Sequence, residues 1–321
     1  MTSTVFVTSD LPPPGIEPLQ AAGLRVSQCT SEPRPGRAEL EEGLGDADAL
    51  LCLLTDRIDG ALLDCAPRLK VVANLAVGYD NVDLGAAAAR GIVVTNTPDV
   101  LTEATADLTW ALILAAARRV VEGDRLVRDG RWIGWRPDQL LGSAVAGRTL
   151  GILGMGAIGC AVARRASGFG MQVWYHNRHR SPHESELGAR YVSVDELFAG
   201  ADILTLHAPL NAESRHVIGA SAFDRMKPSA ILVNTARGPL VDERALVEAL
   251  RAGRLAAAAL DVYEDEPELT EGLAELDNVV LLPHLGSATR PARAAMVDLC
   301  CRNIIAVLSG EPPITPVPTG A

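Results

Sequence analysis

The stretch LGILGMGAIG, residues 150–159, decides the fold of this chain. It places glycines at positions 154, 156 and 159 directly after an apolar run that is typical of a buried strand. A helical pattern follows at residues 157–167, and another apolar run begins at residue 172. A Gly-x-Gly-x-x-Gly pattern in this context predicts the phosphate-binding turn of a doubly wound dinucleotide-binding fold.

Each glycine of this turn has a physical task. Gly154 permits the tight turn, Gly156 lets a pyrophosphate approach the backbone N–H groups at the helix N-terminus, and Gly159 permits close helix–strand packing. We therefore expect cofactor contacts along the whole turn, from Gly154, Met155, Gly156, Ala157, Ile158 and Gly159.

The residues after the next strand bear on the choice between NAD and NADP. An NAD site usually places a carboxylate there, about 20 residues on, to hold the ribose 2′-hydroxyl. Here the chain has Asn177, Arg178 and Arg180, and no carboxylate before Glu184. Two guanidinium groups suit a 2′-phosphate, so we predict that NADPH is preferred and NADH is possible. The alternative is an exposed basic loop without a ligand.

Three histidines in the same region, at positions 176, 179 and 183, invite comparison with a metal site. Arginines lie between them, and a guanidinium beside a cation is unfavourable. We therefore predict no metal site, and His179 could instead assist at the 2′-phosphate.

Further apolar runs alternate with helical patterns on both sides of the glycine turn. Four short runs precede it, and the series beginning at the turn contains six, which predicts two parallel sheets with crossover helices. A single long helix is expected at residues 102–128, and another at residues 290–308. The predicted fold class is α/β with two doubly wound parallel-sheet domains.

Composition excludes several classes of protein. The chain is 48% apolar and 21% charged, and its net charge is −11, without a basic block that would favour nucleic acid as a partner. No apolar run approaches the ~20 residues of a membrane span, and the N-terminus has no signal-peptide pattern. The six cysteines form no C-x-x-C motif, which favours free thiols and a cytoplasmic location.

Three segments at the ends of predicted strands carry candidate catalytic groups. They are LVNTARGPLVD at 232–242, LDVYEDEP at 260–267 and LLPHLGSAT at 281–289, which contain Arg237, Glu266 and His284. Each residue taken singly could be a surface or core side chain. Together, beside a nicotinamide site, an arginine that fixes a carboxylate, a histidine that donates a proton and a carboxylate that orients the imidazole suit reversible reduction of a 2-oxo acid.

These motifs, with NLAVGYDNVD at 74–83, TPDVLTEATAD at 97–107 and HAPL at 207–210, resemble the D-isomer-specific 2-hydroxy acid dehydrogenase family over essentially the whole chain. The resemblance implies that Arg237, Glu266 and His284 are the catalytic trio. It also implies that Val77 and Gly78 offer N–H groups to the substrate carboxylate and that Leu54 faces the substrate. Further cofactor contacts are implied at Thr105, Asn177, His207, Ala208, Pro209, Thr235, Ala236, Asp261 and Gly286.

The same resemblance implies the domain organisation. A Rossmann cofactor domain, residues 100–287, is inserted into a flavodoxin-like substrate domain made of residues 1–99 and 288–321. The resemblance also implies a homodimer built through the cofactor domains. Trp135, in DGRWIGWRP at 129–137, would then border the substrate of the other subunit, or simply pack in the dimer.

Within the family, the chain most resembles the glyoxylate/hydroxypyruvate reductases, which implies a small 2-oxo acid as the substrate. Two alternatives stay open. One is oxidation of phosphite, although Val77 stands where phosphite dehydrogenase has a lysine. The other is a non-catalytic NAD(H)-sensing co-regulator of the same fold, which would keep the trio but turn over oxo acids poorly.

Overall fold

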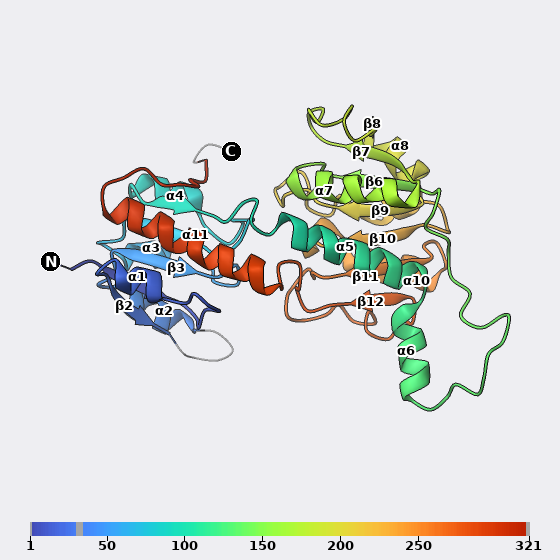
Figure 1. Cartoon of the computed structure of the whole chain (residues 1–321), viewed down its shortest axis with the longest axis horizontal. Helices are drawn as coiled ribbons and strands as arrows, with labels where there is room; N and C mark the ends of the chain where they lie inside the picture. Colours follow the sequence, from blue (N-terminus) through green and yellow to red (C-terminus); the bar gives the residue numbers. More distant parts are fainter. Residues whose placement is uncertain (1, 30–34, 319–321) are drawn as a thin grey trace. The chain divides into compact units, whose positions relative to one another are not determined.

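The structure, a computed structural model, describes residues 2–29 and 35–318. It divides into two compact units, which we call unit 1 (Met1–Leu101 with Ser287–Ala321) and unit 2 (Thr102–Gly286). The chain leaves unit 1 once and returns to it once, so unit 2 is inserted in the sequence of unit 1 (Figure 1).

Unit 1 is built on a five-stranded, fully parallel sheet. Its strands are β1 (Thr4–Val7), β2 (Arg25–Gln28), β3 (Ala49–Cys52), β4 (Val71–Asn74) and β5 (Val93–Thr95). Their order is β2-β1-β3-β4-β5, which is the flavodoxin-like order and confirms the predicted fold class for this part. The apolar runs did not include β2, because this edge strand alternates exposed and half-buried residues.

Helices cover both faces of this sheet. On one face, α1 (Glu17–Ala21) packs beside α11 (Arg290–Leu308), which lies against β3 and β4 (Figure 1). On the other face, α2 (Arg37–Leu44), α3 (Gly60–Asp64) and α4 (Leu84–Ala89) close an apolar core. Helix α11 spans the predicted residues 290–308, and the Thr289 side chain caps it by accepting the Ala292 N–H.

Unit 2 is built on a seven-stranded, fully parallel sheet in the order β12-β11-β10-β9-β6-β7-β8. The strands are β6 (Thr149–Leu153), β7 (Gln172–His176), β8 (Arg190–Tyr191), β9 (Ile203–Leu206), β10 (Ile231–Asn234), β11 (Ala257–Leu260) and β12 (Val279–Leu281). This is the Rossmann order with one strand added at the edge, and the order reverses between β6 and β9. Six of the strands were predicted, and β8, with only two residues, was not.

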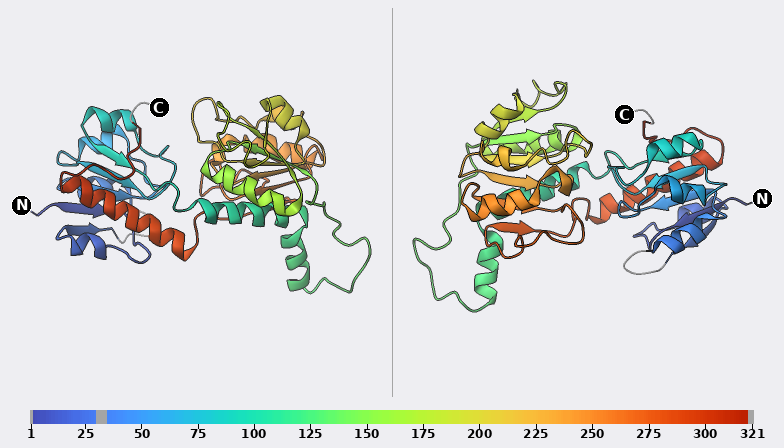
Figure 2. Two further views of the ribbon diagram at one scale, coloured as in Figure 1. Left: turned by 45° about the horizontal axis from the view of Figure 1, so that its top comes forward. Right: turned by 180° about the vertical axis from the view of Figure 1, so that it is seen from behind.

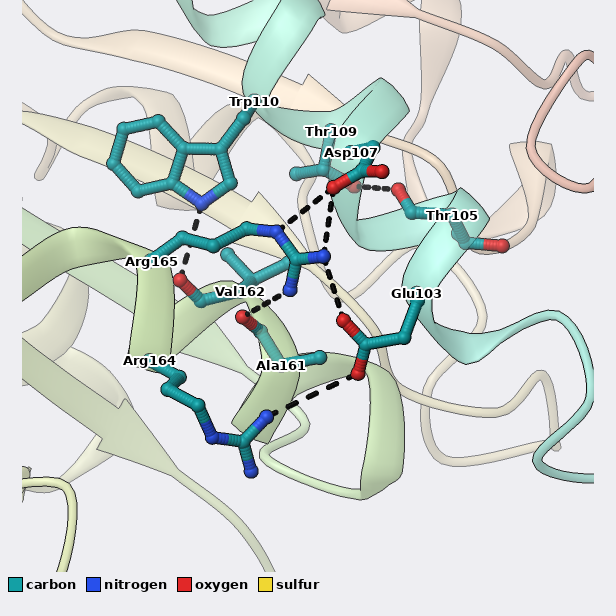
Figure 3. Close-up of polar contacts among 9 residues, drawn as sticks. All are labelled: Glu103, Thr105, Asp107, Thr109, Trp110, Ala161, Val162, Arg164 and Arg165. Carbon is teal, nitrogen blue, oxygen red and sulfur yellow. Dashed lines mark hydrogen bonds and ion pairs between the residues drawn. The ribbon is translucent and has the colours of Figure 1, made fainter. Parts of the chain in front are cut away.

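The helices of unit 2 form two layers around separate apolar clusters. Helices α5 (Thr102–Ala117) and α7 (Ala157–Ala166) pack together on one face, and α8 (Val194–Gly200), α9 (Ala220–Phe223) and α10 (Glu243–Arg251) cover the other. Figure 3 shows the polar contacts between α5 and α7. Trp110 Nε1 donates to Val162 O at 3.1 Å, and Arg165 binds Asp107 at 2.7 Å and Glu103 at 2.6 Å. These contacts fix α7, whose N-terminus adjoins the glycine turn.

The single helix expected at residues 102–128 is wrong, because the structure has two. Helix α5 ends at Ala117, and α6 (Val120–Arg128) begins after Arg119, whose φ of 53° is left-handed. The carbonyl of Ala117 accepts the N–H of Ser143 at 2.8 Å. This hydrogen bond to the segment that follows α6 replaces the one that a continuing helix would make. Helix α6 buries none of its residues, and it projects from the rest of unit 2 (Figure 2).

The two longest helices belong to the packed cores. Within residues 2–29 and 35–318, no helix combines the length and apolar character needed to cross a bilayer. All six cysteines are unpaired, and Cys300 and Cys301 on α11 are buried.

Candidate active site

The turn between β6 and α7 has the geometry that its glycines predict. Gly154 has φ of +96°, and a Cβ there would lie 2.4 Å from the backbone nitrogen of Ala208. A Cβ on Gly159 would lie 2.5 Å from the carbonyl oxygen of Gly154. These two glycines are therefore required by the packing of the protein itself.

Gly156 is different, because no atom lies within 4 Å of a Cβ built on it and its φ of −84° suits any residue. It is the N-cap of α7, and the N–H groups of Gly156 and Ala157 donate to no acceptor among the described residues. Open space and unused donors at a helix N-terminus form a cradle that fits a dinucleotide pyrophosphate.

Asn177, at the end of β7, binds this turn directly. Its Oδ1 accepts the N–H of Met155 at 2.6 Å. Arg178 follows as an exposed side chain without a protein partner in the described chain, whereas Arg180 pairs with Glu184 at 2.7 Å. Sequence reasoning treated the two arginines as equivalent, and their surroundings differ.

The nearby histidines turn to separate partners. His176 Nδ1 lies 2.8 Å from Val192 O, and His183 Nδ1 lies 3.3 Å from Glu186. Among residues 2–29 and 35–318, no group of three or more His, Cys, Asp or Glu side chains could hold a metal ion.

His284 and Glu266 form a hydrogen-bonded pair after strands β12 and β11. His284 Nδ1 lies 2.9 Å from Glu266 Oε2, and both side chains are about three-quarters buried, with exposed fractions of 27% and 28%. The other carboxylate oxygen, Oε1, accepts the N–H of Tyr263 at 3.0 Å. The Nε2 of His284 makes no hydrogen bond within the described chain, so it is available to a ligand.

The charges around Glu266 keep it ionised. Burial acts to raise the pKa of Glu266, but the hydrogen bond and charge of His284, the N–H of Tyr263 and the charge of Arg237 outweigh it. The net pKa lies below the ordinary value of a glutamate. Glu266 is therefore an ionised hydrogen-bond partner for His284 Nδ1.

Asp261 holds the turn that carries His284. Its two buried carboxylate oxygens accept the N–H groups of Leu285 and Gly286 at 2.6 and 2.7 Å, and its carbonyl accepts the N–H of His284 at 2.9 Å. His284 has a left-handed φ of 54°, a conformation that is costly outside glycine. Three hydrogen bonds to one residue therefore fix a strained turn. Burial raises the pKa of Asp261.

Arg237 lies on the turn that follows β10. The buried Asn234 accepts the N–H of Ala236 at 3.0 Å and donates to the carbonyl of Arg237 at 2.8 Å. A Cβ on Gly238 would lie 1.8 Å from the carbonyl oxygen of Tyr263, so only glycine lets this turn approach the segment that carries Glu266. Arg237, Glu266 and His284 thus lie on turns joined by direct backbone contacts.

A chain of threonine hydroxyls runs beside this site. Thr105 Oγ1 donates to Gly286 O at 3.1 Å, and Thr109 Oγ1 donates to Thr105 O at 2.8 Å and lies 3.0 Å from Thr235 Oγ1. Beyond β9, His207 Nε2 lies 3.0 Å from Thr205 Oγ1, and burial lowers the pKa of His207. Its imidazole is therefore neutral near pH 7. Ala208 and Pro209 follow at the switch point between β6 and β9.

In unit 1, two asparagine amides fix the turn that carries Val77 and Gly78, and a third binds the neighbouring loop. Asn96 donates to Val77 O at 2.7 Å, Asn74 donates to Gly78 O at 2.9 Å, and Asn81 donates to Leu53 O at 3.1 Å, beside Leu54. The N–H groups of Val77 and Gly78 donate to no acceptor in the described chain. Fixed carbonyls and unused N–H groups suit a small anion.

Trp135 lies apart from these groups, in the segment that follows α6. It is 80% exposed, and Ile133 beside it is 90% exposed.

Sequence reasoning missed the residues that hold the site together. Asn234, Tyr263 and the asparagines of unit 1 touch the candidate residues through backbone groups. A signal existed for Asn234, because an amide directly after an apolar strand needs internal partners when it is buried.

An anion cradle at the switch point of a Rossmann sheet, with a His–Glu pair and an arginine at the same carboxyl edge, defines a nucleotide-dependent oxidoreductase. The description "D-isomer specific 2-hydroxyacid dehydrogenase, NAD binding domain" matches residues 110–286. A glyoxylate reductase from Thermococcus onnurineus (strain NA1) is 50% identical over 320 residues, covering 98% of this chain and 96% of the relative. The chain belongs to the D-isomer-specific 2-hydroxyacid dehydrogenases.

Solved structures agree with this assignment. The TT0316 protein from Thermus thermophilus superposes with a TM-score of 0.91 at 47% identity, covering 98% of this chain and 100% of that one. An NADPH-dependent glyoxylate/hydroxypyruvate reductase from Sinorhizobium meliloti, in complex with NADP and malonate, gives a TM-score of 0.89 at 36% identity, covering 99% and 98%. The chain is therefore an enzyme of this family that uses a nicotinamide cofactor.

Proposed function

We propose that this enzyme is an NADPH-preferring reductase that converts glyoxylate, hydroxypyruvate or both to D-2-hydroxy acids. The observation that carries the proposal is the His284–Glu266 pair, with a contact of 2.9 Å and a free Nε2, on the sheet that bears the glycine turn. The names of similar proteins, glyoxylate reductase from Thermococcus onnurineus among them, support the substrate.

In the proposed reaction, the dihydronicotinamide supplies a hydride when it is bound. His284 donates the Nε2 proton to the 2-oxo oxygen while the C=O π bond breaks and the hydride adds to carbon. Glu266 stabilises the imidazolium before the transfer and holds the ring in place throughout. The oxo acid is reduced by two electrons, and the cofactor is oxidised by two.

Arg237 is proposed to bind the substrate carboxylate and polarise the oxo group. The charge of Arg237 contributes to the low pKa of Glu266, the carboxylate partner of the proposed proton donor, which supports this role. The unused N–H groups of Val77 and Gly78 are proposed to bind a carboxylate, with Leu54 beside the substrate. We therefore assign unit 1 as the substrate domain and unit 2 as the cofactor domain.

Cofactor binding is proposed along the carboxyl edge of the unit 2 sheet. The glycine turn would hold the pyrophosphate, Asp261 and the threonine chain would border the nicotinamide, and an arginine after β7 would contact the 2′-phosphate. Six unpaired cysteines fit the reducing cytoplasm, where NADPH is held in its reduced form.

Initial rates of NADPH and NADH oxidation with glyoxylate, hydroxypyruvate, pyruvate and phenylpyruvate test this proposal. We expect the highest kcat/KM with NADPH and one of the first two acids. Turnover only with phenylpyruvate would discard the substrate and keep the chemistry. Tight NADPH binding without any turnover would contradict the reductase proposal, and cofactor reduction on adding phosphite would replace it.

We also propose a homodimer built through unit 2. Helix α6 and the segment after it expose large apolar side chains, including Val127, Ile133, Trp135 and Leu141, at 58%, 90%, 80% and 69%. Apolar surface of this extent on a projecting arm favours a protein partner, and Trp135 would then border the partner's substrate. Sedimentation equilibrium should give twice the mass of 33.8 kDa, and Ile133→Asp with Leu141→Asp should shift it to the monomer. A wild-type monomer at micromolar concentration would contradict this proposal.

A further inference from the structure

Arg180 is already occupied by two partners within the protein. Its Nη1 lies 2.7 Å from Glu184 Oε1, and its guanidinium carbon lies 5.0 Å from the centre of the Tyr191 ring. The ion pair offsets part of its charge even though the side chain is 67% exposed, and the ring covers one of its faces. A phosphate could recruit Arg180 only by competing with both contacts.

Glu184 is itself held from the protein interior. The hydroxyl of the fully buried Tyr175 donates to Glu184 Oε2 at 2.5 Å and accepts the N–H of Ser181 at 3.0 Å. Burial, and then the hydrogen bond to Glu184, raise the pKa of Tyr175, so the hydroxyl keeps the proton that it donates. Glu184 therefore keeps its position whether or not Arg180 is bound.

Arg178 has neither an ion-pair partner nor a ring contact of the kind that engages Arg180. Its side chain is exposed and has no partner in the described part of the chain. It follows Asn177, which is fixed on one side by the N–H of Met155 at 2.6 Å and on the other by the Tyr191 hydroxyl, which donates to its carbonyl at 3.1 Å. The backbone from which Arg178 extends is thus tied directly to the cofactor turn.

From this contrast we propose that Glu184 is a specificity-determining residue: it withholds Arg180 from the cofactor 2′-phosphate, leaves that contact to Arg178 alone, and limits the preference for NADPH. This inference rests on the proposed use of NADPH. Its physical basis is charge: a carboxylate near a dianionic phosphate repels it and also neutralises the second guanidinium. The preference for NADPH over NADH would then be smaller than it would be if both arginines bound the 2′-phosphate.

The test compares two probes that differ only in the 2′-phosphate, adenosine 2′,5′-bisphosphate and adenosine 5′-monophosphate, by calorimetry on the full chain. Arg178→Gln should weaken binding of the bisphosphate at least about tenfold, the loss of one charge-assisted contact. Arg180→Gln should weaken it less than about threefold, because that guanidinium is engaged elsewhere. Glu184→Gln should strengthen it about threefold. Binding of the monophosphate is the internal reference.

Arg190→Gln is the matched control for loss of a nearby positive charge. Arg190 stands on β8, with its guanidinium carbon 4.9 Å from the centre of the Trp174 ring. Its removal should leave the ratio of the two affinities within about twofold. In the double variant Glu184→Gln/Arg180→Gln, the gain from Glu184→Gln should shrink, because the released guanidinium is gone.

Several results would overturn this inference. They are an equal loss from Arg178→Gln and Arg180→Gln, weaker bisphosphate binding in Glu184→Gln, or an undiminished gain in the double variant. Failure of the reductase proposal is distinguishable, because NADPH-dependent turnover of glyoxylate is a separate measurement and both probes bind without turnover. A wild-type protein that binds the two probes equally would refute the phosphate role of Arg178 directly.

Discussion

Replacing His284 with alanine should lower kcat for glyoxylate about 10²- to 10⁴-fold, while the Kd for NADPH stays within about twofold. The imidazole donates its proton only as the hydride arrives, so its loss removes stabilisation of the transition state and leaves ground-state binding of the cofactor intact. Single-turnover kinetics with fluorescence titration of NADPH separate the two quantities. Turnover within tenfold of wild type would remove His284 from the reaction.

Glu266→Gln supplies the control for this prediction, together with a pH profile. Because the pKa of Glu266 lies below its ordinary value, the carboxylate stays ionised in mildly acidic buffer, so kcat for reduction should hold as the pH is lowered into that range. Glu266→Gln should lower kcat and leave the Kd for NADPH unchanged, because a neutral amide no longer stabilises the charged imidazole during proton transfer. An unchanged kcat in Glu266→Gln would mean that Glu266 only shapes the turn.

The second large effect is expected at the glycine turn, where two neighbouring glycines have opposite roles. Gly154→Ala should lower the free energy of unfolding by about 2–6 kcal/mol, because it combines a φ of +96° with a Cβ 2.4 Å from the backbone of Ala208. Urea denaturation followed by tryptophan fluorescence measures this change. Wild-type stability in this variant would contradict the close approach of the two segments.

Gly156→Ala is the matched variant two residues further on. Its Cβ meets no protein atom within 4 Å, so the free energy of unfolding should change by less than about 0.5 kcal/mol. The methyl group would nevertheless occupy the place where the pyrophosphate approaches the helix N-terminus, and the Kd for NADPH should rise at least about tenfold. Unchanged NADPH binding would show that the cofactor does not lie on this turn.

Sequence reasoning succeeded where local chemistry decides the structure. The apolar run of β6 and the helical pattern of α11 are visible in the chain, and the structure contains the helix predicted at residues 290–308 and the six strands predicted for unit 2. Strand β2 escaped because its residues are held by pairing with β1 and not by burial. The helix break at Arg119 was not predicted because it depends on a hydrogen bond to the carbonyl of Ala117 from Ser143, 26 residues further on.

The candidate site shows the same division. The glycine pattern and the residues Arg237, Glu266 and His284 are legible as motifs, and the structure brings the turns of this trio together. The sequence did not reveal which side chains bind one another, such as Glu184 in its ion pair with Arg180 and Asp261 in its hydrogen bonds to the turn after His284. A linear pattern reveals which groups are present, but not which of them are already engaged.

The close approach of Gly238 to Tyr263 and the hydrogen bonds of Asp261 lie wholly within residues 102–286, a single uninterrupted piece of the chain. The proposed acid, its carboxylate partner and the dinucleotide cradle can therefore be inherited as one block. The segments that carry Leu54 and Val77, the proposed substrate contacts, lie outside this block. Substitutions in those segments therefore leave the block that holds the proposed proton donor unchanged.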